Sequence, residues 1–159
     1  MQFRRSSPAC LALVAVLLGA CAPQPPAPPG PARPAPAQEA AAPALPAELL
    51  DVDWGWVGMT TPVEDVNVHV PDKYTIRFRS GERIEVRADC NRGSASYSIG
   101  ADRRIEIGPV ALTRMACPPG SLSDRFAREL GRVGSYFVQD GELHLELSVD
   151  SGTLRFRRL

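Results

Sequence analysis

Two turn signals near the C-terminus constrain the fold more than any other feature of the sequence. Asp140-Gly141 and Ser151-Gly152 each stand between segments in which apolar and polar residues alternate. Such dipeptides favour two-residue hairpin turns, and alternation is typical of half-buried strands. The two turns predict a three-stranded antiparallel meander with the pairs Val138–Leu143, Tyr136–Leu145, Val149–Leu154 and Leu147–Phe156. All the paired apolar residues then share one face, as a real sheet requires.

A second pair of alternating segments lies upstream. Tyr74 to Phe78 and Ile84 to Cys90 carry apolar residues at every second position. A three-residue turn at Arg79-Ser80-Gly81, with Gly81 in the left-handed conformation, predicts the pairs Ile76–Ile84 and Tyr74–Val86. The same alternation places Cys90 on the core face.

Further strands and one helix complete the expected fold. Trp54–Met59 reads as an opening strand, Ser94–Ile99 and Arg104–Ile107 as a hairpin, and Val110–Met115 as an extended segment. The spacing of Leu122, Phe126, Leu130 and Val133 then predicts a helix over Leu122–Val133, and Ser121 with Asp124 resembles a capping box. The predicted fold class is α+β, with a curved, partly barrel-like antiparallel sheet packed against one α-helix.

The N-terminus has the order of a secretory signal. Arg4 and Arg5 precede an apolar run from Ala9 to Ala20, which is too short to span a membrane. The segment Leu18-Gly19-Ala20-Cys21 resembles the bacterial lipoprotein box, which implies a signal peptide at residues 1–20 and acyl chains such as palmitate on Cys21. Ala22 is similar to an outer-membrane sorting signal, which implies a lipid-anchored protein of the cell envelope that faces the periplasm. The alternative is an ordinary signal peptide in which Cys21 has no role.

Proline and alanine dominate residues 22–47. Proline fixes φ and removes amide donors, so we expect a semi-rigid spacer after the lipidated cysteine, with residues 21–47 reaching at most about 80 Å. Residues 48–159 remain as one small domain. Basic and acidic residues number 18 each. Loss of Arg4 and Arg5 with the signal leaves a slightly acidic mature chain, which argues against a nucleic-acid partner.

Two cysteines remain after Cys10 leaves with the signal and Cys21 takes the lipid. Cys90 and Cys117 form an even pair in an oxidising compartment, so a disulfide is the expected state. Two free thiols and a metal pair stay open as alternatives, although neither cysteine has a CxxC partner or a nearby histidine.

Three short blocks carry a family resemblance. Asp89-Cys90-Asn91-Arg92, Gly108-Pro109 and Thr113-Arg114-Met115-Ala116-Cys117 resemble the META domain of HslJ-like heat-shock lipoproteins. The resemblance covers residues 48–159. It implies a compact envelope domain linked to heat stress, with no assigned molecular activity. It also implies a shape similar to pilotin lipoproteins, which assist secretin assembly.

Few residues qualify as site candidates. His69 and His144 lack catalytic companions at motif spacing, and we expect no catalytic, cofactor or metal site. Trp54 and Trp56 share one strand face, either as core filling or as an exposed platform for a partner. Arg114 is a candidate contact for an anion or a partner carboxylate. The alternatives are an internal ion pair with Asp89 or hydrogen bonds to loop carbonyls.

These observations favour a non-enzymatic, membrane-tethered envelope lipoprotein with a binding, assembly or stress-response role and a possible envelope protein partner. One alternative is a small-ligand carrier or enzyme that uses the concavity of the sheet. The other is a pilotin-like role in secretin assembly.

Overall fold

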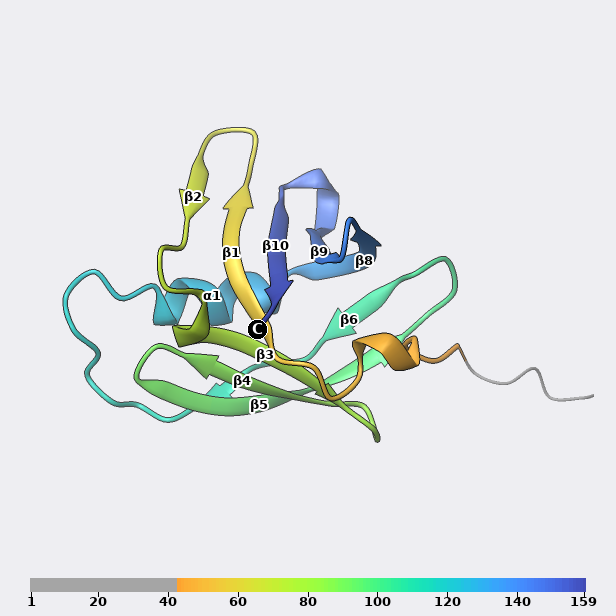
Figure 1. Cartoon of the computed structure of the whole chain (residues 1–159), viewed down its shortest axis with the longest axis horizontal. Helices are drawn as coiled ribbons and strands as arrows, with labels where there is room; N and C mark the ends of the chain where they lie inside the picture. The colour runs from red at the N-terminus through yellow and green to blue at the C-terminus, as the bar shows by residue number, and fades with distance from the viewer. Residues whose placement is uncertain (1–42) are drawn as a thin grey trace, which may run out of the picture. The chain divides into compact units, whose positions relative to one another are not determined.

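The computed structural model describes residues 43–159 (Figure 1). The predicted signal peptide 1–20, the lipid site Cys21 and the spacer up to residue 42 lie outside the described residues. The described elements are the 3-10 turns η1 (Ala47–Leu49), η2 (Pro71–Lys73) and η3 (Ser148–Asp150), the helix α1 (Ser123–Leu130), and the strands β1 (Trp54–Thr60), β2 (Asp65–Asn67), β3 (Tyr74–Arg79), β4 (Arg83–Ala88), β5 (Asn91–Ile99), β6 (Ile105–Ile107), β7 (Ala111–Leu112), β8 (Val133–Gln139), β9 (Glu142–Leu147) and β10 (Thr153–Arg158).

The strands form one sheet that curves into a nearly closed barrel. Its order is β6-β5-β4-β3-β1-β10-β9-β8, with β2 paired to β1 and β7 paired to β5. The two ends of this order approach each other, because Arg104 forms an antiparallel bridge with Ser135 and the Tyr136 amide donates to the Arg103 carbonyl at 3.1 Å. The predicted α+β class with a partly barrel-like sheet is confirmed.

Large side chains fill the inside of the sheet. Trp54 and Trp56 of β1 are fully buried, and the ring of Phe126 from α1 stacks on Trp56 with centroids 4.9 Å apart. Tyr74 of β3 packs edge-on against both rings. Helix α1 therefore closes the core by inserting an aromatic side chain against β1 and β3. Stacked and edge-to-face rings add to the stability that burial of their area provides.

The predicted faces of the β3–β4 hairpin are confirmed, but the predicted register is wrong by two residues. Ile76 pairs with Val86 and Phe78 with Ile84, so the turn is Ser80-Gly81-Glu82. Gly81 and Glu82 both have positive φ, of 80° and 58°. The turn starts one residue later than predicted because Glu82 also takes the left-handed conformation. A shift of two keeps every side chain on its predicted face.

The predicted strand register of the C-terminal meander is confirmed around the first turn and wrong around the second. Val138 pairs with Leu143 and Tyr136 with Leu145, as Asp140-Gly141 predicts. Around the second turn Leu145 pairs with Leu154, a register four residues away from the prediction. The reason is that β9 ends at Leu147 and η3 follows, so Val149 is solvent-exposed instead of paired.

The segments around Cys117 also differ from expectation. The observed helix is shorter than predicted and starts at Ser123. Its N-cap is Leu122, which makes no side-chain cap hydrogen bond, so the predicted Ser121–Asp124 capping box is wrong. The extended segment Val110–Met115 contributes only the two residues of β7. The predicted hairpin of β5 and β6 is confirmed, with Ile99 paired to Ile105.

Candidate functional site

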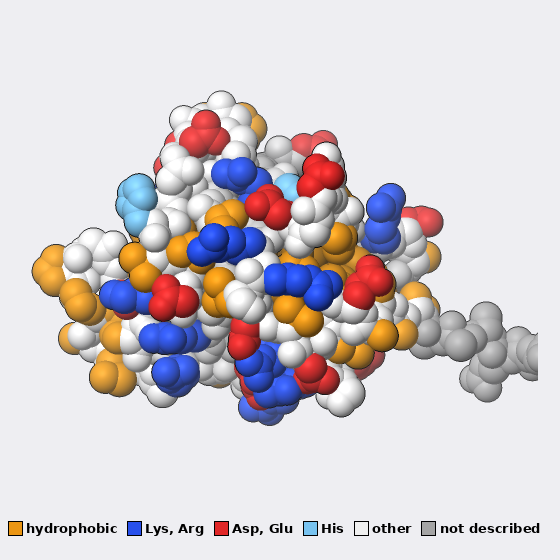
Figure 2. Space-filling model, viewed as in Figure 1, with side chains coloured by type: hydrophobic (Ala, Val, Ile, Leu, Met, Phe, Trp, Pro, Cys, Tyr) orange, Lys and Arg blue, Asp and Glu red, His pale blue; other side chains and the backbone are white. Residues whose placement is uncertain are grey.

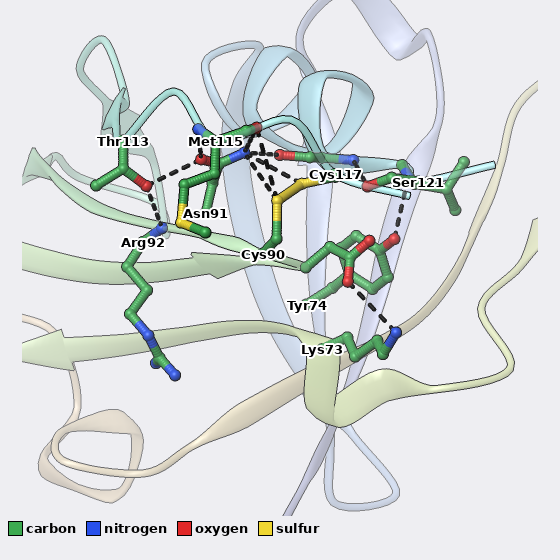
Figure 3. Close-up of a disulfide and its surroundings, with 12 residues drawn as sticks. Lys73, Tyr74, Cys90, Asn91, Arg92, Thr113, Met115, Cys117 and Ser121 are labelled. Carbon is green, nitrogen blue, oxygen red and sulfur yellow. Dashed lines mark hydrogen bonds and ion pairs between the residues drawn. A yellow bond between two sulfur atoms is a disulfide. The ribbon is translucent and has the colours of Figure 1, made fainter. Parts of the chain in front are cut away.

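A disulfide joins Cys90 to Cys117, with their Cα atoms 5.5 Å apart. It ties the turn between β4 and β5 to the loop that leads into α1 (Figure 3). The free-thiol and metal-pair alternatives therefore do not describe these cysteines. The expectation that Cys90 lies on the core face is wrong, because β4 ends at Ala88 and Asp89 turns the chain with a φ of 57°. Both cysteines are half-buried.

The buried side chain of Asn91 organises the loop on the far side of the disulfide. Its Oδ1 accepts hydrogen bonds from the Met115 amide at 2.8 Å and from the Thr113 hydroxyl at 2.9 Å. Its Nδ2 donates to the Met115 carbonyl at 3.2 Å and lies 3.3 Å from the Ser123 hydroxyl. The Cys117 sulfur is 3.2 Å from the same nitrogen. Both backbone groups that the Asn91 side chain satisfies belong to Met115, which lies 24 residues away along the chain.

The two longest side chains of the loop Thr113–Cys117 are exposed to solvent. Arg114 is exposed, and Met115 is 63% exposed although its backbone is held on both sides by Asn91. Within residues 43–159 the Arg114 guanidinium has no hydrogen bond or ion pair. The predicted internal pairing with Asp89 is wrong, because Asp89 pairs with Lys73 at 3.4 Å. We call Arg114 and Met115 the loop platform.

A surface hollow of about 540 Å³ lies beside the loop platform. Its lining mixes apolar side chains, namely Val110, Leu112 and Ala116 from the loop side and Ala127 from α1, with the polar residues Asn91 and Thr113. Asp124 adds the one carboxylate that lines it. The hollow is open to solvent and offers a place for an apolar side chain of a partner next to the Arg114 charge.

A second polar cluster supports the other side of the disulfide. A hydrogen bond from Ser121, followed by the charge of Lys73, holds the pKa of Asp89 below its ordinary value of 3.8. The Tyr74 hydroxyl accepts a hydrogen bond from the Leu122 amide at 3.0 Å. These contacts join β3 and the β4–β5 turn to the start of α1. The segment that carries the loop platform is therefore held by Asn91 on one side and by these contacts on the other.

The two tryptophans do not form an exposed platform. Both are fully buried, and their indole N–H groups donate to backbone carbonyls, Trp56 to Gly58 at 2.8 Å and Trp54 to Leu49 at 3.4 Å. The partner-contact interpretation of Trp54 and Trp56 is therefore wrong, and the core-filling alternative is correct. Their shared face is the inner face of the sheet, where Phe126 of α1 stacks on Trp56.

The histidines lie apart from the loop platform. His69 is exposed, while His144 on β9 is half-buried and stacks on Phe137 with ring centroids 4.5 Å apart. Across residues 43–159, no three His, Cys, Asp or Glu side chains gather in a way that could hold a metal ion. None of the helices in this part of the chain has the length and apolar character needed to cross a membrane.

Sequence reasoning identified Arg114 and Asn91 but missed Met115 and Thr113 as parts of one assembly. The signal was present in the block Thr113-Arg114-Met115-Ala116-Cys117, but its fold-back onto Asn91 depends on contacts 22 to 26 residues apart along the chain. Alternation along single strands carries no information about such contacts.

Comparisons with known proteins agree with this description. The model of the META domain matches residues 47–158. The fold is similar to a solved structure of a DUF4847 family protein from Bacteroides vulgatus ATCC 8482, with a TM-score of 0.50 and 12% identity, covering 69% of this chain and 93% of that chain. At this identity the likeness shows a shared fold alone. No curated protein matches the chain.

Proposed function

Because the chain belongs to the META domain family, we propose that it is an envelope protein that acts by binding or assembly in a stress response, without catalysis of its own. The proposal includes a lipid tether at Cys21 in the outer membrane and a spacer that holds the folded domain in the periplasm. The loop platform is its binding surface.

The observation that carries the proposal is the combination of exposed side chains on a fixed backbone. Asn91 and the Cys90–Cys117 bond hold the loop, so Arg114 and Met115 can bind a partner without the cost of ordering it. Arg and Met are enriched at protein interfaces. The partner chemistry that fits is a carboxylate for Arg114 beside an apolar side chain for Met115 and its neighbouring hollow.

The alternative of a ligand or enzyme site in the concavity of the sheet has little support. The inside of the curved sheet is occupied by buried side chains, the largest of which are Trp54, Trp56, Phe78, Phe126 and Phe156. A small-molecule site is normally a concave cavity that buries most of its ligand. The secretin-assembly alternative rests on resemblance, and no contact among residues 43–159 favours it over other partners.

The tether is tested by replacing Cys21. In cells that express the natural chain, we expect palmitate label on the protein and recovery in the membrane fraction. The Cys21→Ser variant should lose the label and move to the soluble fraction. An unlabelled natural chain, or a variant that stays labelled, contradicts lipidation at this residue.

The binding surface is tested by complementation of a deletion strain under heat stress. Arg114→Glu reverses the charge of the platform and should fail to complement, while Arg83→Glu should complement fully. Arg83 is a matched control because it is also exposed and has no ion pair within residues 43–159. Full complementation by Arg114→Glu, with both variants at equal abundance, overturns the role of the platform.

A further inference from the structure

The strand register aligns five outward-facing positions in one row across the sheet. Arg157 of β10 pairs with Gly55 of β1, Gly55 with Thr75 of β3, Thr75 with Arg87 of β4, and Arg87 with Arg92 of β5. Because neighbouring residues on β3 and β4 point into the core, these side chains lie on the outer surface.

Two arginines therefore face each other directly across β4 and β5. Like charges at directly opposed positions destabilise an antiparallel pair. Neither the Arg87 nor the Arg92 guanidinium has a carboxylate partner or hydrogen bond among residues 43–159. The Nε atom of Arg87 is buried and has no hydrogen-bond acceptor. An unpaired buried donor adds a further cost.

The next two rows differ because their β3 arginines, Arg77 and Arg79, are neutralised. Arg77 forms an ion pair with Asp53, and Arg79 pairs with Asp51 at 2.7 Å and with Glu85 at 3.1 Å. The contrast shows that this surface supplies carboxylates to Arg77 and Arg79 of β3 and leaves Arg87 and Arg92 without them.

A hollow of about 520 Å³ lies over the unpaired arginines. Its lining includes Thr75, Arg87, Arg92 and Leu159, together with the already paired Arg77–Asp53. Two further carboxylates line the hollow, Glu85 and Asp72. Glu85 forms an ion pair with Arg79. Basic side chains gather over β4 and β5 on the face seen in Figure 2, and Figure 3 shows the Arg92 side chain directed away from the disulfide.

We infer that Arg87 and Arg92 form a binding site for a phosphate group. Two guanidinium forks on neighbouring strands match a tetrahedral group that offers several acceptor oxygens and up to two negative charges. A bound phosphate accepts hydrogen bonds from the two guanidinium groups and neutralises the repulsion between them. Thr75 in the same row provides a hydroxyl for a further oxygen.

The ligand is a phosphate monoester or free phosphate, since both present the same dianionic group. This site is separate from the loop platform and does not depend on the proposed function. It lies on the outer surface of the sheet, where either a phosphorylated headgroup or a dissolved ion can reach it.

The test is an NMR titration of the purified full chain, followed through the side-chain Nε–H signals of Arg87 and Arg92. Inorganic phosphate, glycerol 3-phosphate and acetate are added separately at constant ionic strength. Both phosphates should give saturable shifts. Arg87→Gln and Arg92→Gln should each weaken phosphate binding by about 10-fold or more. Arg83→Gln, a charge-matched change on the same strand and face, should weaken it by less than about twofold.

Each outcome has a defined reading. Tighter binding of glycerol 3-phosphate supports a phosphorylated headgroup as the source, and tighter binding of inorganic phosphate supports the free ion. Arg87→Lys retains the charge without the fork and should also bind more weakly, which keeps the test valid if a glutamine variant misfolds. Absence of saturable shifts, equal binding of acetate, or an equal loss in Arg83→Gln overturns the site.

Discussion

The side chain of Asn91 holds both backbone polar groups of Met115, accepting from its amide at 2.8 Å and donating to its carbonyl at 3.2 Å. Paired strands satisfy each other's backbone through the same two kinds of contact. Here one side chain replaces a strand partner, in a loop that forms no strand beyond the two residues of β7. The exposure of Arg114 and Met115 therefore does not require a mobile backbone.

Loss of this side chain should destabilise the protein. In Asn91→Ala the Met115 and Thr113 groups lose their buried partner, and we expect the free energy of unfolding to fall by about 1–3 kcal/mol. Urea denaturation measures the change. Asn67→Ala on the exposed strand β2 is the control and should change stability by less than about 0.5 kcal/mol. Equal effects of the two substitutions contradict the role of Asn91.

Removal of the disulfide should lower the free energy of unfolding, because the unfolded chain is then no longer constrained by the closed loop. Cys90 and Cys117 are separated by 27 residues. For a closed loop of this length, the chain-entropy model gives a loss of about 3–4 kcal/mol in a Cys90→Ser/Cys117→Ser double variant. Denaturation of the natural protein with and without reductant provides an independent measurement. A double variant as stable as the natural chain is the contrary result.

Val149 should be a site of stored backbone strain. Its φ in η3 is 57°, a value that β-branched residues rarely adopt. Its side chain is 92% exposed, so replacing it removes little packing. Val149→Gly removes the strain and should raise the unfolding free energy by about 1 kcal/mol. Val63→Gly is the control, since Val63 is 89% exposed and is not among the residues with positive φ. The control should be neutral or destabilising, and a stability loss in Val149→Gly speaks against strain.

The pKa of His144 should lie below its ordinary value of 6.5. Desolvation beside Phe137 disfavours the charged ring, Arg155 acts in the same direction, and Glu142, Asp140 and Glu146 oppose it. Because the folded-state pKa is the lower one, the unfolded chain binds more protons just below pH 6.5. The contribution of His144 to stability is therefore lost as the pH falls from 6.5 toward the folded pKa.

An NMR titration of the His144 ring measures this pKa directly. A His144 pKa at or above 6.5 contradicts the desolvation argument. A His144→Phe variant should lose the corresponding pH dependence of stability.

Local patterns predicted the strand faces but not all registers. Alternation along β3, β4, β9 and β10 places the apolar residues on one side, and this holds in the structure. The register depends on turns, and two turns use left-handed residues that the sequence does not mark, Glu82 and Val149. Both errors are even-numbered shifts, which explains why the faces were right although the pairs were wrong.

The candidate site was only partly predictable for a related reason. The Trp54–Trp56 alternation shows a shared face, but whether that face is covered depends on Phe126 from α1, which stacks on Trp56. The Arg87–Arg92 opposition likewise follows from the β4–β5 register. Properties that depend on contacts between distant segments required the structure.

The central claim, that the loop platform binds an envelope partner, is tested most directly by photo-crosslinking in living cells at residue 115. A photoreactive amino acid replaces Met115, and the same replacement at Val63, whose side chain is more exposed than that of Met115, serves as the control. We expect a discrete crosslinked envelope protein at residue 115 alone, with its yield reduced at least about tenfold when Arg114→Glu is added. The absence of a discrete product at residue 115, or a yield that is independent of Arg114, contradicts the account.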